Sequence, residues 1–573
     1  MSVSMTPRLN KRLVLAALAA ATGVAVAVGP PAAAGQSGAS GTAGRPAKTV
    51  PVRLIAVNDF HGNLEPPTGS SGRIVDETGT TVDAGGAAYM ATHIKQMADA
   101  NTTLVAAGDL IGATPLISAA YHDEPTVELL GKLGLEVSAV GNHEFDEGYK
   151  ELLRIMKGGC HPVDGCSPAG KWRGAEYDYL GANVRFKKAP EVPAIAPFSV
   201  KRINGVKVGF IGLVTATTPS IVTAEGIKDL TFVEEVAAAN RASKALRALG
   251  VKAQVVLVHE GDQINAGQSP DACSVVPGAG SRIAQGVTPE IDLVIMGHSH
   301  QAYICKVKDP AGQDRYVTQG SSFGRVLTQF DFQVDKRTGD VVRSSVVADN
   351  RVVTRNVTPD PEIAAFVQTW KDRVAEVANR QIGTITADIT RTPAASGETP
   401  LGNLIADAQL EATTTGGNAQ VALMNPGGVR ADLTFGTDNG VVTYGEAFTV
   451  QPFNNLMQVV TLTGAQLDAL LEQQYQVNRV LAPSASLTYT VSASAAVGSK
   501  VSDIKINGTP VTETQQIRVA ANNFLVGGGD GFTVFTQGTD LWSGPLDIDA
   551  FVAYFGAHSP VAPPATNRIT VAP

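Results

Sequence analysis

Excess positive charge is the first feature this 573-residue sequence lacks, since it carries 45 Lys and Arg residues against 53 Asp and Glu residues. The net charge at pH 7 is −8. A protein that binds a nucleic-acid polymer needs a broad basic surface that neutralises the phosphate backbone. The charge balance therefore argues against a nucleic-acid polymer as a partner, whereas small phosphates held through metal ions are compatible with it.

The sequence also lacks the composition of a disordered chain. Charged residues make up 17% and hydrophobic residues 44% of the sequence, as in ordinary globular proteins. At roughly 150 residues per domain, the length predicts two or more domains, each able to bury a core.

Long apolar runs are absent except near the start of the chain. There, Leu13–Val28 follows three basic residues and precedes the alanines at 32–34. This pattern predicts a secretory signal peptide over residues 1–34 and a flexible leader over residues 35–49. The alternative, a membrane anchor, needs ~20 apolar residues, more than this run supplies. We therefore expect a protein of the extracellular or cell-envelope space without a transmembrane anchor.

Cysteine is scarce. The four cysteines are Cys160, Cys166, Cys273 and Cys305. An even number in an exported chain suggests disulfides, and three pairings are possible. A bond from Cys160 to Cys166 would close a short loop, and one from Cys273 to Cys305 would close a longer insertion. The alternative, a zinc site, needs closely spaced cysteine pairs, which are absent.

What the sequence does contain is a recurring unit, a short apolar run followed by a tight polar turn. The runs are Val52–Val57, Leu104–Ala107, Val137–Val140, Val255–Val258 and Leu293–Met296. They have the length of buried strands, and amphipathic stretches lie between them. Strands alternating with helices predict a layered α/β sandwich domain whose polar residues gather at the strand ends.

The pattern changes further along the chain. We predict that the first domain covers residues 50–355, a linking helix lies within 356–382, and a smaller α+β domain covers 383–573. In the linker, apolar residues recur at helical spacing from Ile363 to Val374.

Five of the nine histidines directly follow the strand-like runs. They stand in the motifs Asp59-x-His61, Gly141-Asn142-His143, His259 and Gly297-His298-x-His300, and Gly108-Asp109 follows a strand in the same way. Carboxylate, amide and imidazole groups are the ligands that borderline divalent metals prefer. The other four histidines, His93, His122, His161 and His558, lie outside these motifs, and we assign them no role.

The order of these motifs resembles that of the calcineurin-like metallophosphoesterases. More closely, the chain is similar to the secreted bacterial two-domain 5'-nucleotidase family, which includes UDP-sugar hydrolases and 2',3'-cyclic-nucleotide phosphodiesterases. The second domain contributes to this resemblance through the segments Leu401–Ala408, Asn425–Arg430, Pro452–Asn455 and Asn523–Phe532. The resemblance implies a nucleotide-binding second domain.

The resemblance also implies two divalent metal ions, zinc, manganese or similar. One would be held by Asp59, His61, Asp109 and His300, and the other by Asp109, Asn142, His259 and His298. Two such ions activate water for phosphoryl transfer, so no protein nucleophile is needed. His143 would stabilise the transition state or act as leaving-group acid, and Asp146 would fix the tautomer of its imidazole.

For the substrate, the resemblance implies six residues of the second domain. Arg430 and Asn425 would bind phosphate, Phe453 and Phe524 would stack on the base, Asn455 would contact the base edge, and Asp530 would accept from ribose hydroxyls. The family commonly has a further phosphate-binding arginine before the Leu401–Ala408 segment. Here Ala394–Glu398 takes that place, and Arg391 lies slightly upstream.

We therefore expect a hydrolase that converts small nucleoside monophosphates to nucleosides and phosphate. Nucleotide sugars, dinucleotides and 2',3'-cyclic nucleotides are alternative substrates for the same site. A catalytically silent nucleotide-binding surface protein is the alternative outside enzymes, and the intact ligand motifs argue against it. The sequence leaves the metals, the preferred base and the oligomeric state open.

Overall fold

The computed structural model of the protein describes residues 48–222, 224–265 and 269–572. The predicted signal peptide and the predicted leader up to residue 47 lie outside the described residues. The first strand begins at Thr49. Within the described ranges, every helix is too short or too polar to cross a membrane.

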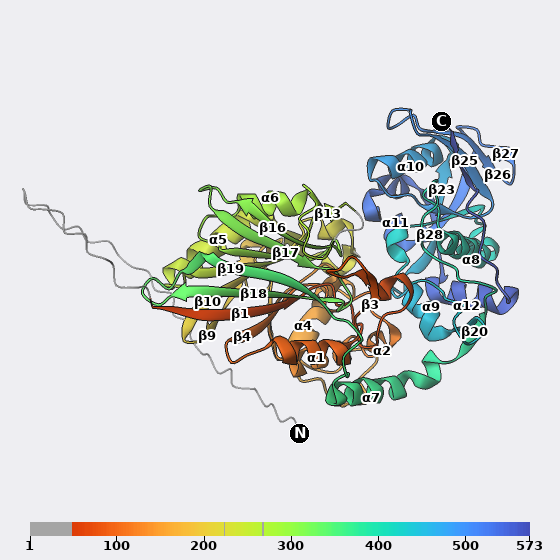
Figure 1. Ribbon diagram of the computed structural model, residues 1–573. Coiled ribbons are helices and arrows are strands. Elements are labelled where there is room, and N and C mark those ends of the chain that lie inside the picture. The colour runs from red at the N-terminus through yellow and green to blue at the C-terminus, as the bar shows by residue number, and fades with distance from the viewer. Residues whose placement is uncertain (1–47, 223, 266–268, 573) are drawn as a thin grey trace, which may run out of the picture. The chain divides into compact units, whose positions relative to one another are not determined.

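Two six-stranded sheets form the first half of the fold (Figure 1). The first runs in the order β19 (Val341–Val352), β18 (Val326–Asp335), β1 (Thr49–Val57), β4 (Thr102–Ala107), β5 (Leu135–Ala139) and β6 (Asp178–Leu180). The second runs β16 (Ala302–Lys308), β17 (Asp314–Gly320), β15 (Leu293–Met296), β12 (Ala253–His259), β10 (Val206–Val214) and β9 (Phe198–Ile203). Each sheet has four parallel strands side by side, and antiparallel strands extend it. All five strand-like runs of the sequence lie in parallel strands.

A shared apolar core lies between the two sheets. Side chains such as Leu54 and Val105 from the first sheet meet Phe210 and Leu257 from the second in one buried cluster. The inner strands are buried on both faces because helices cover their outer sides, as in β12, where all residues are buried. This explains why the sequence shows continuous apolar runs there rather than alternation.

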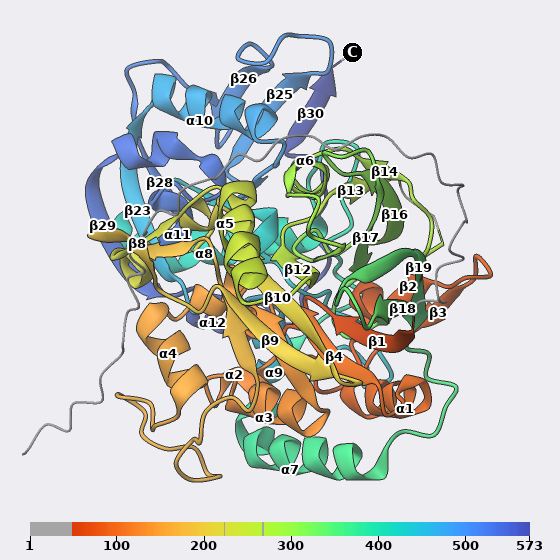
Figure 2. The same ribbon diagram turned by 90° about the vertical axis from the view of Figure 1, so that its left-hand side faces the viewer.

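Helices cover the outer face of each sheet. The first sheet is covered by α1 (Ala87–Met97), α3 (Glu124–Lys132), α4 (Tyr149–Lys157) and α7 (Pro361–Ala378), and the second by α5 (Glu235–Ala248) and α6 (Ala279–Gly286). Figure 2 shows α5 lying along β10. The predicted layered α/β sandwich is thus confirmed.

The predicted linking helix is α7, and it is anchored to the first half. Pro361 stands at its first position, and the Asp360 carboxylate accepts from the Glu362 and Ile363 N–H groups. Ile363, Trp370 and Val374 are buried, and the helix packs on α1 and on α2 (Leu116–Ala119). The apolar spacing in the sequence therefore marks the face that joins the core.

The second half is a smaller α+β arrangement, as predicted. Its central sheet runs β24 (Ala482–Pro483), β21 (Val421–Met424), β28 (Gln516–Asn522), β23 (Leu456–Thr463) and β29 (Thr539–Leu546). α10 (Gly464–Gln476) packs on one face and α8 (Pro400–Gly417) on the other. Thr463 and Gln466 form a capping box at the start of α10.

Smaller elements complete the second half. A further sheet runs β27 (Thr509–Pro510), β26 (Val501–Ile506), β25 (Leu487–Ser492) and β30 (Ile569–Ala572). β20 (Gln381–Thr384) pairs with β22 (Val441–Thr443). α9 (Tyr444–Val450) and α12 (Asp547–His558) contribute to the core that contains α8.

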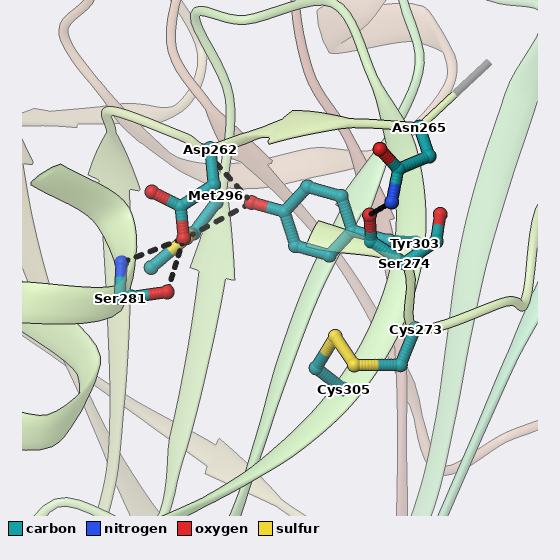
Figure 3. The surroundings of a disulfide bond; sticks show 8 residues. All are labelled: Asp262, Asn265, Cys273, Ser274, Ser281, Met296, Tyr303 and Cys305. Carbon is teal, nitrogen blue, oxygen red and sulfur yellow. Dashed lines mark hydrogen bonds between the residues drawn. A yellow bond between two sulfur atoms is a disulfide. The ribbon is translucent and has the colours of Figure 1, made fainter. Parts of the chain in front are cut away.

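Two disulfides are present, Cys160–Cys166 and Cys273–Cys305. The second joins the segment after β12 to β16 (Figure 3). Next to it, the Tyr303 hydroxyl accepts from the Asp262 N–H at 3.3 Å and donates to the Met296 sulfur at 3.2 Å. The zinc alternative for the cysteines is therefore wrong.

Candidate functional site

The polar turns after the parallel strands meet at one edge of the two sheets. Asp59 and His61 follow β1, Asp109 follows β4, Asn142 and His143 follow β5, His259 ends β12, and His298 and His300 follow β15. Five of these residues have positive φ: Asp59 at 49°, His61 at 45°, Asp109 at 48°, His298 at 71° and His300 at 59°. Left-handed backbone is costly for residues other than glycine and collects at functional sites.

The ligand-type side chains form two groups. In each group the ligand atoms lie within 4.8 Å of one another, one group being Asp59, His61 and His300 and the other Asp109, His259 and His298. In the first, the His300 Nε2 atom lies 3.2 Å from Asp59 Oδ1 and 3.3 Å from His61 Nε2. In the second, His259 Nε2 lies 2.9 Å from Asp109 Oδ2.

Asp109 stands between the groups. Its Oδ2 atom also lies 3.6 Å from His61 Nε2 in the first group. Burial alone would raise the pKa of Asp109, but His259 and His143 hold it well below its usual range, so the side chain is a carboxylate. Asp109 can therefore serve both groups.

The ring orientations of the histidines suit metal binding. His61 Nδ1 lies 2.8 Å from the Gly112 carbonyl oxygen, and His259 Nδ1 lies 2.8 Å from the Ala107 carbonyl oxygen. A carbonyl accepts only, so each Nδ1 carries a proton and each Nε2 faces the group as the ligand atom. Burial holds the pKa of His61 well below its ordinary value and lowers that of His298 to about 3, which keeps both imidazoles neutral.

The donor set fits divalent metal ions. The Asn142 Oδ1 atom is buried without a hydrogen-bond partner among the described residues. Buried polar atoms ordinarily have a partner, and a metal ion would supply one here. Carboxylate oxygens and imidazole nitrogens converge beside this amide oxygen, so the residues present fit borderline divalent ions.

Two buried residues that the sequence analysis did not select support the ligands. The Glu144 carboxylate accepts from the backbone N–H groups of Asp109 at 3.0 Å, Leu110 at 2.9 Å and Gly141 at 2.5 Å. Asn58 Nδ2 donates to Asp59 Oδ2 at 2.6 Å. Both lie directly beside a ligand motif, and this adjacency is the feature of the sequence from which they could have been predicted.

His143 lies beside the two groups without belonging to either. Its backbone N–H donates to Asp109 Oδ1 at 2.9 Å, and its Nδ1 atom lies 2.8 Å from Asp146 Oδ2. The ring stacks near Phe453 with 5.8 Å between centroids. The His143 imidazole and the Asp146 carboxylate are thus in direct contact.

A cavity of about 520 Å³ joins these residues to the second half of the fold. From the first half its lining includes Asp109, Asn142, His143, Asp146, His298 and His300. From the second half it includes all six predicted substrate residues, Asn425, Arg430, Phe453, Asn455, Phe524 and Asp530. Residues more than 400 positions apart in sequence thus line one space.

Arg430 is an arginine of this lining whose charge interacts with those of Asp109, Asp146 and Asp59. Its Nη2 atom is buried and has no hydrogen-bond partner in the described part of the chain. The guanidinium lies 6.0 Å over the Phe453 ring. A buried guanidinium with an unpaired donor suits an anion such as phosphate.

Other members of the lining are held by neighbours. Asn425 Nδ2 donates to Asp530 Oδ2 at 3.0 Å, and Arg479 Nε lies 3.7 Å from Asp530 Oδ1. Asn455 Nδ2 donates to Asp547 at 3.2 Å. Arg479 is a second arginine of the cavity that the sequence analysis did not select.

Arg391 precedes Ala394–Glu398, the segment that stands where the family commonly has a further arginine. It lies outside this cavity lining. Its Nη2 atom donates to Ser71 Oγ at 2.7 Å, and its Nε atom lies 3.7 Å from Asp432. It lines a different cavity of about 390 Å³ behind the Asn425–Arg430 loop. In this arrangement Arg391 serves as a contact between the two halves of the fold.

Comparison with known proteins identifies relatives for both halves. Residues 52–302 match the calcineurin-like phosphoesterase family, and residues 381–537 match the 5'-nucleotidase C-terminal domain. The chain is 35% identical over 549 residues to a cell wall protein of Listeria monocytogenes, covering 90% of this chain and 68% of that protein. It is 31% identical over 536 residues to an endonuclease of Bacillus subtilis, covering 92% of this chain but only 41% of that protein.

Among solved structures, the fold is similar to a 5'-nucleotidase precursor from Thermus thermophilus. The TM-score is 0.74 at 26% sequence identity, with 91% of this chain and 99% of that chain covered. The likeness therefore includes both halves of the fold.

Proposed function

The chain belongs to the calcineurin-like phosphoesterases that carry a 5'-nucleotidase C-terminal domain, and on this premise we propose that it hydrolyses nucleoside monophosphates to nucleosides and phosphate. As a member of this family it is a phosphoric ester hydrolase. The observation that carries the substrate proposal is the shared cavity. It has metal-ligand groups and His143 on one side and Arg430, Phe453 and Phe524 on the other.

We assign seven residues to metal binding. Asp59, His61, His300 and Asp109 would hold one divalent ion, and Asp109, Asn142, His259 and His298 the other. When bound, two such ions supply positive charge for the phosphoryl oxygens and activate water for attack. The protein's own contribution is to hold the ligands in place through contacts such as those of Glu144 and Asn58.

His143 and Arg430 would act on the phosphate directly. With Asp146 holding Nδ1, the Nε2 atom of His143 is the nitrogen available to stabilise charge on the phosphoryl group or to protonate the leaving oxygen. The unpaired Nη2 donor of Arg430 would bind a phosphate oxygen and orient the ester.

The second half would recognise the nucleoside. Phe453 and Phe524 would stack on the base, Asn455 would contact its edge, and Asp530 would accept from the ribose. Aromatic stacking tolerates different bases, because every base has a π face. We also propose that the protein acts outside the cytoplasm, which its two disulfides and the similarity to a cell wall protein support.

A substrate panel tests the proposal. The products of hydrolysis would be separated and quantified, namely nucleoside and phosphate from a nucleoside monophosphate, and the phosphomonoesters formed from a nucleotide sugar, a dinucleotide, a 2',3'-cyclic nucleotide and single-stranded DNA. Each divalent metal would be tested in turn, and chelator would serve as the metal-free condition. We expect the monophosphate to give the highest kcat/KM and chelator to abolish turnover. A higher kcat/KM for another substrate would assign the site to that substrate, and full activity in chelator would overturn the metal assignment.

A further inference from the structure

A third cluster of metal-ligand side chains lies apart from the two groups described above. It consists of His122, Glu147, Glu151 and His161, and one ligand atom from each lies within 4.8 Å of all the others. His122 precedes α3, Glu147 and Glu151 stand just before and within the first turn of α4, and His161 lies in the loop closed by Cys160 and Cys166. Four separate positions of the chain thus converge.

The contacts within the cluster are close. His122 Nδ1 lies 2.9 Å from Glu147 Oε2. The rings of His122 and His161 stack with 3.7 Å between centroids and 17° between planes. Two stacked imidazoles would repel each other if both were protonated. Protonation of both rings is therefore a poor way to balance the two carboxylates, and a bound cation would balance them better.

Asp164 contacts both imidazoles from outside the group. Its Oδ2 atom lies 2.9 Å from His122 Nε2 and 3.0 Å from His161 Nδ1. A carboxylate that contacts the far nitrogen of a histidine is the usual outer partner of a metal-bound imidazole. The Asp164 backbone N–H also lies 3.1 Å from His161 Nδ1. With the proton of each ring directed at Asp164 Oδ2, the opposite nitrogen of each ring is left for a ligand.

Glu151 is held in place by a buried arginine. Arg154 Nε donates to both Glu151 oxygens at 2.8 and 3.0 Å, and Arg154 Nη1 donates to the Gly159 carbonyl at 2.8 Å. The same arginine thus fixes one ligand and the start of the disulfide loop. Less conformational entropy would then be lost when a metal binds.

The electrostatic surroundings favour a cation. A cavity of about 250 Å³ touches the cluster, and its lining includes Asp123, Glu144, Asp146, Glu147 and Glu151. Glu147 Oε2 and Asp164 Oδ2 each lie 2.9 Å from a ring nitrogen of His122. The carboxylates gathered there would attract a divalent ion.

We propose that His122, Glu147, Glu151 and His161 form a third divalent-metal site, structural in role and specific for a zinc-like ion. Two neutral imidazoles and two carboxylates balance the charge of such an ion. This mixed nitrogen and oxygen set suits zinc, whereas calcium and magnesium prefer oxygen ligands alone. Binding requires the stacked rings to tilt apart, and it fastens the Cys160–Cys166 loop to the start of α4.

A metal ion at this site would also stabilise the position of residues next to the candidate catalytic centre. Glu147 follows Asp146, the residue that contacts His143, and the cavity beside the cluster is also lined by His143 and Phe453. A metal ion at this place would restrict the segment that carries Asp146. The site itself does not depend on the substrate proposed above.

The test compares zinc content between variants of the full chain. Protein stripped with chelator would be dialysed against Zn²⁺, and bound zinc would be measured per chain in wild type, in the double variant His122→Ala with His161→Ala, and in the control His558→Ala. His558 makes an exposed pair with Glu411 at 2.7 Å outside the cluster. We expect the double variant to hold one zinc equivalent fewer than the other two proteins.

The difference in zinc content between wild type and the double variant does not depend on how many ions the catalytic centre holds. Equal zinc content in wild type and double variant would overturn the proposal, as would an equal loss in the His558 control. Glu147→Gln, at a half-exposed side chain, provides a second test if the double variant does not fold, and it should weaken binding of the same equivalent. Replacement of that equivalent by Mg²⁺ or Ca²⁺ at equal concentration would overturn the assignment to a zinc-like ion.

Discussion

At the scale of single residues, the proposed metal ligands are distinct from His143, the residue proposed to act on substrate. Asp109 lies within reach of both ligand groups, whereas His143 contacts Asp109 only through its backbone N–H and turns its ring toward Asp146. Replacing each side chain should therefore have a different effect on metal content.

The His143→Ala variant should bind metal normally and turn over slowly. The change removes a positioned proton donor and charge stabiliser, and such groups contribute typically ~100- to 10,000-fold to the rate. Metal content and kcat with a nucleoside monophosphate are the measurements. Asp109→Ala is the contrasting variant, and it should lose metal as well as activity. Loss of metal from His143→Ala would identify His143 as a ligand instead.

Glu144 gives a second prediction at this scale. Burial and the nearby Asp109 raise its pKa to about 7, yet its two oxygens accept from three backbone N–H groups, which favours the carboxylate. In Glu144→Gln one oxygen becomes an NH₂ group facing these donors. An unsatisfied buried donor costs about 1 to 3 kcal/mol.

Urea unfolding and metal titration would measure the effect of Glu144→Gln. We expect a lower unfolding midpoint and weaker metal binding, because the turns that carry Asp109 and Gly141 lose their shared acceptor. Wild-type stability in this variant would mean that the carboxyl group is protonated in the native protein.

At the scale of elements, α7 combines two roles. It connects the two halves in sequence, and its apolar face belongs to the core of the first half. Trp370 is buried at 2% exposure. Its ring lies 5.1 Å from the Tyr121 ring, tilted by 52°, and 4.2 Å under the Arg373 guanidinium. The helix is therefore attached to the first half through its apolar face.

Trp370→Ala should destabilise the protein strongly. Truncating a buried aromatic side chain costs about 3 to 5 kcal/mol, because apolar contact is lost and a cavity remains. Val377 on the same helix is 53% exposed, so Val377→Ala should change stability by less than about 0.5 kcal/mol. Chemical denaturation of both variants gives the comparison. Similar small effects in both would show that α7 is only loosely attached.

At the scale of the whole molecule, the described residues belong to one compact unit, and the large cavity is lined from both halves. In the proposed function, recognition and chemistry would therefore meet across the two halves. Phe453 would take part in both, because its ring also lies near His143 and under Arg430. Phe524 has no such contact with the catalytic groups among the ring and cation contacts of the described residues.

Because Phe453 contacts His143 and Arg430 and Phe524 does not, substitutions of the two residues should have different effects. Stacking on a base is worth about 1 to 3 kcal/mol, which corresponds to about a five- to 150-fold change in kcat/KM. We expect Phe524→Ala to lower kcat/KM by this factor for a nucleoside monophosphate and much less for an aryl phosphate, which has no base. Phe453→Ala should lower both values. Equal losses for both substrates in Phe524→Ala would show that Phe524 supports the fold rather than the base.

Much of the candidate site could be predicted from local sequence. A strand-length apolar run followed by an Asp, Asn or His turn is a short-range pattern, and parallel strands bring their carboxyl ends to one edge. The place of each motif directly after a strand therefore predicts that its side chains lie at that edge. Glu144 and Asn58 were missed although they lie directly beside these motifs, because only the folded turns show which backbone N–H groups and carboxylates they contact.

Other features were decided by tertiary structure alone. His122 and His161 stand 39 positions apart in turns without a shared motif, and only the packing of α4 against the disulfide loop brings them together. Arg391 lies near the place of the missing family arginine in sequence, yet its partners are Ser71 and Asp432. Local sequence determines which side chains follow each strand, because backbone preferences act over a few residues. Which distant side chains meet depends on how sheets and helices pack, and that packing is a property of the whole chain.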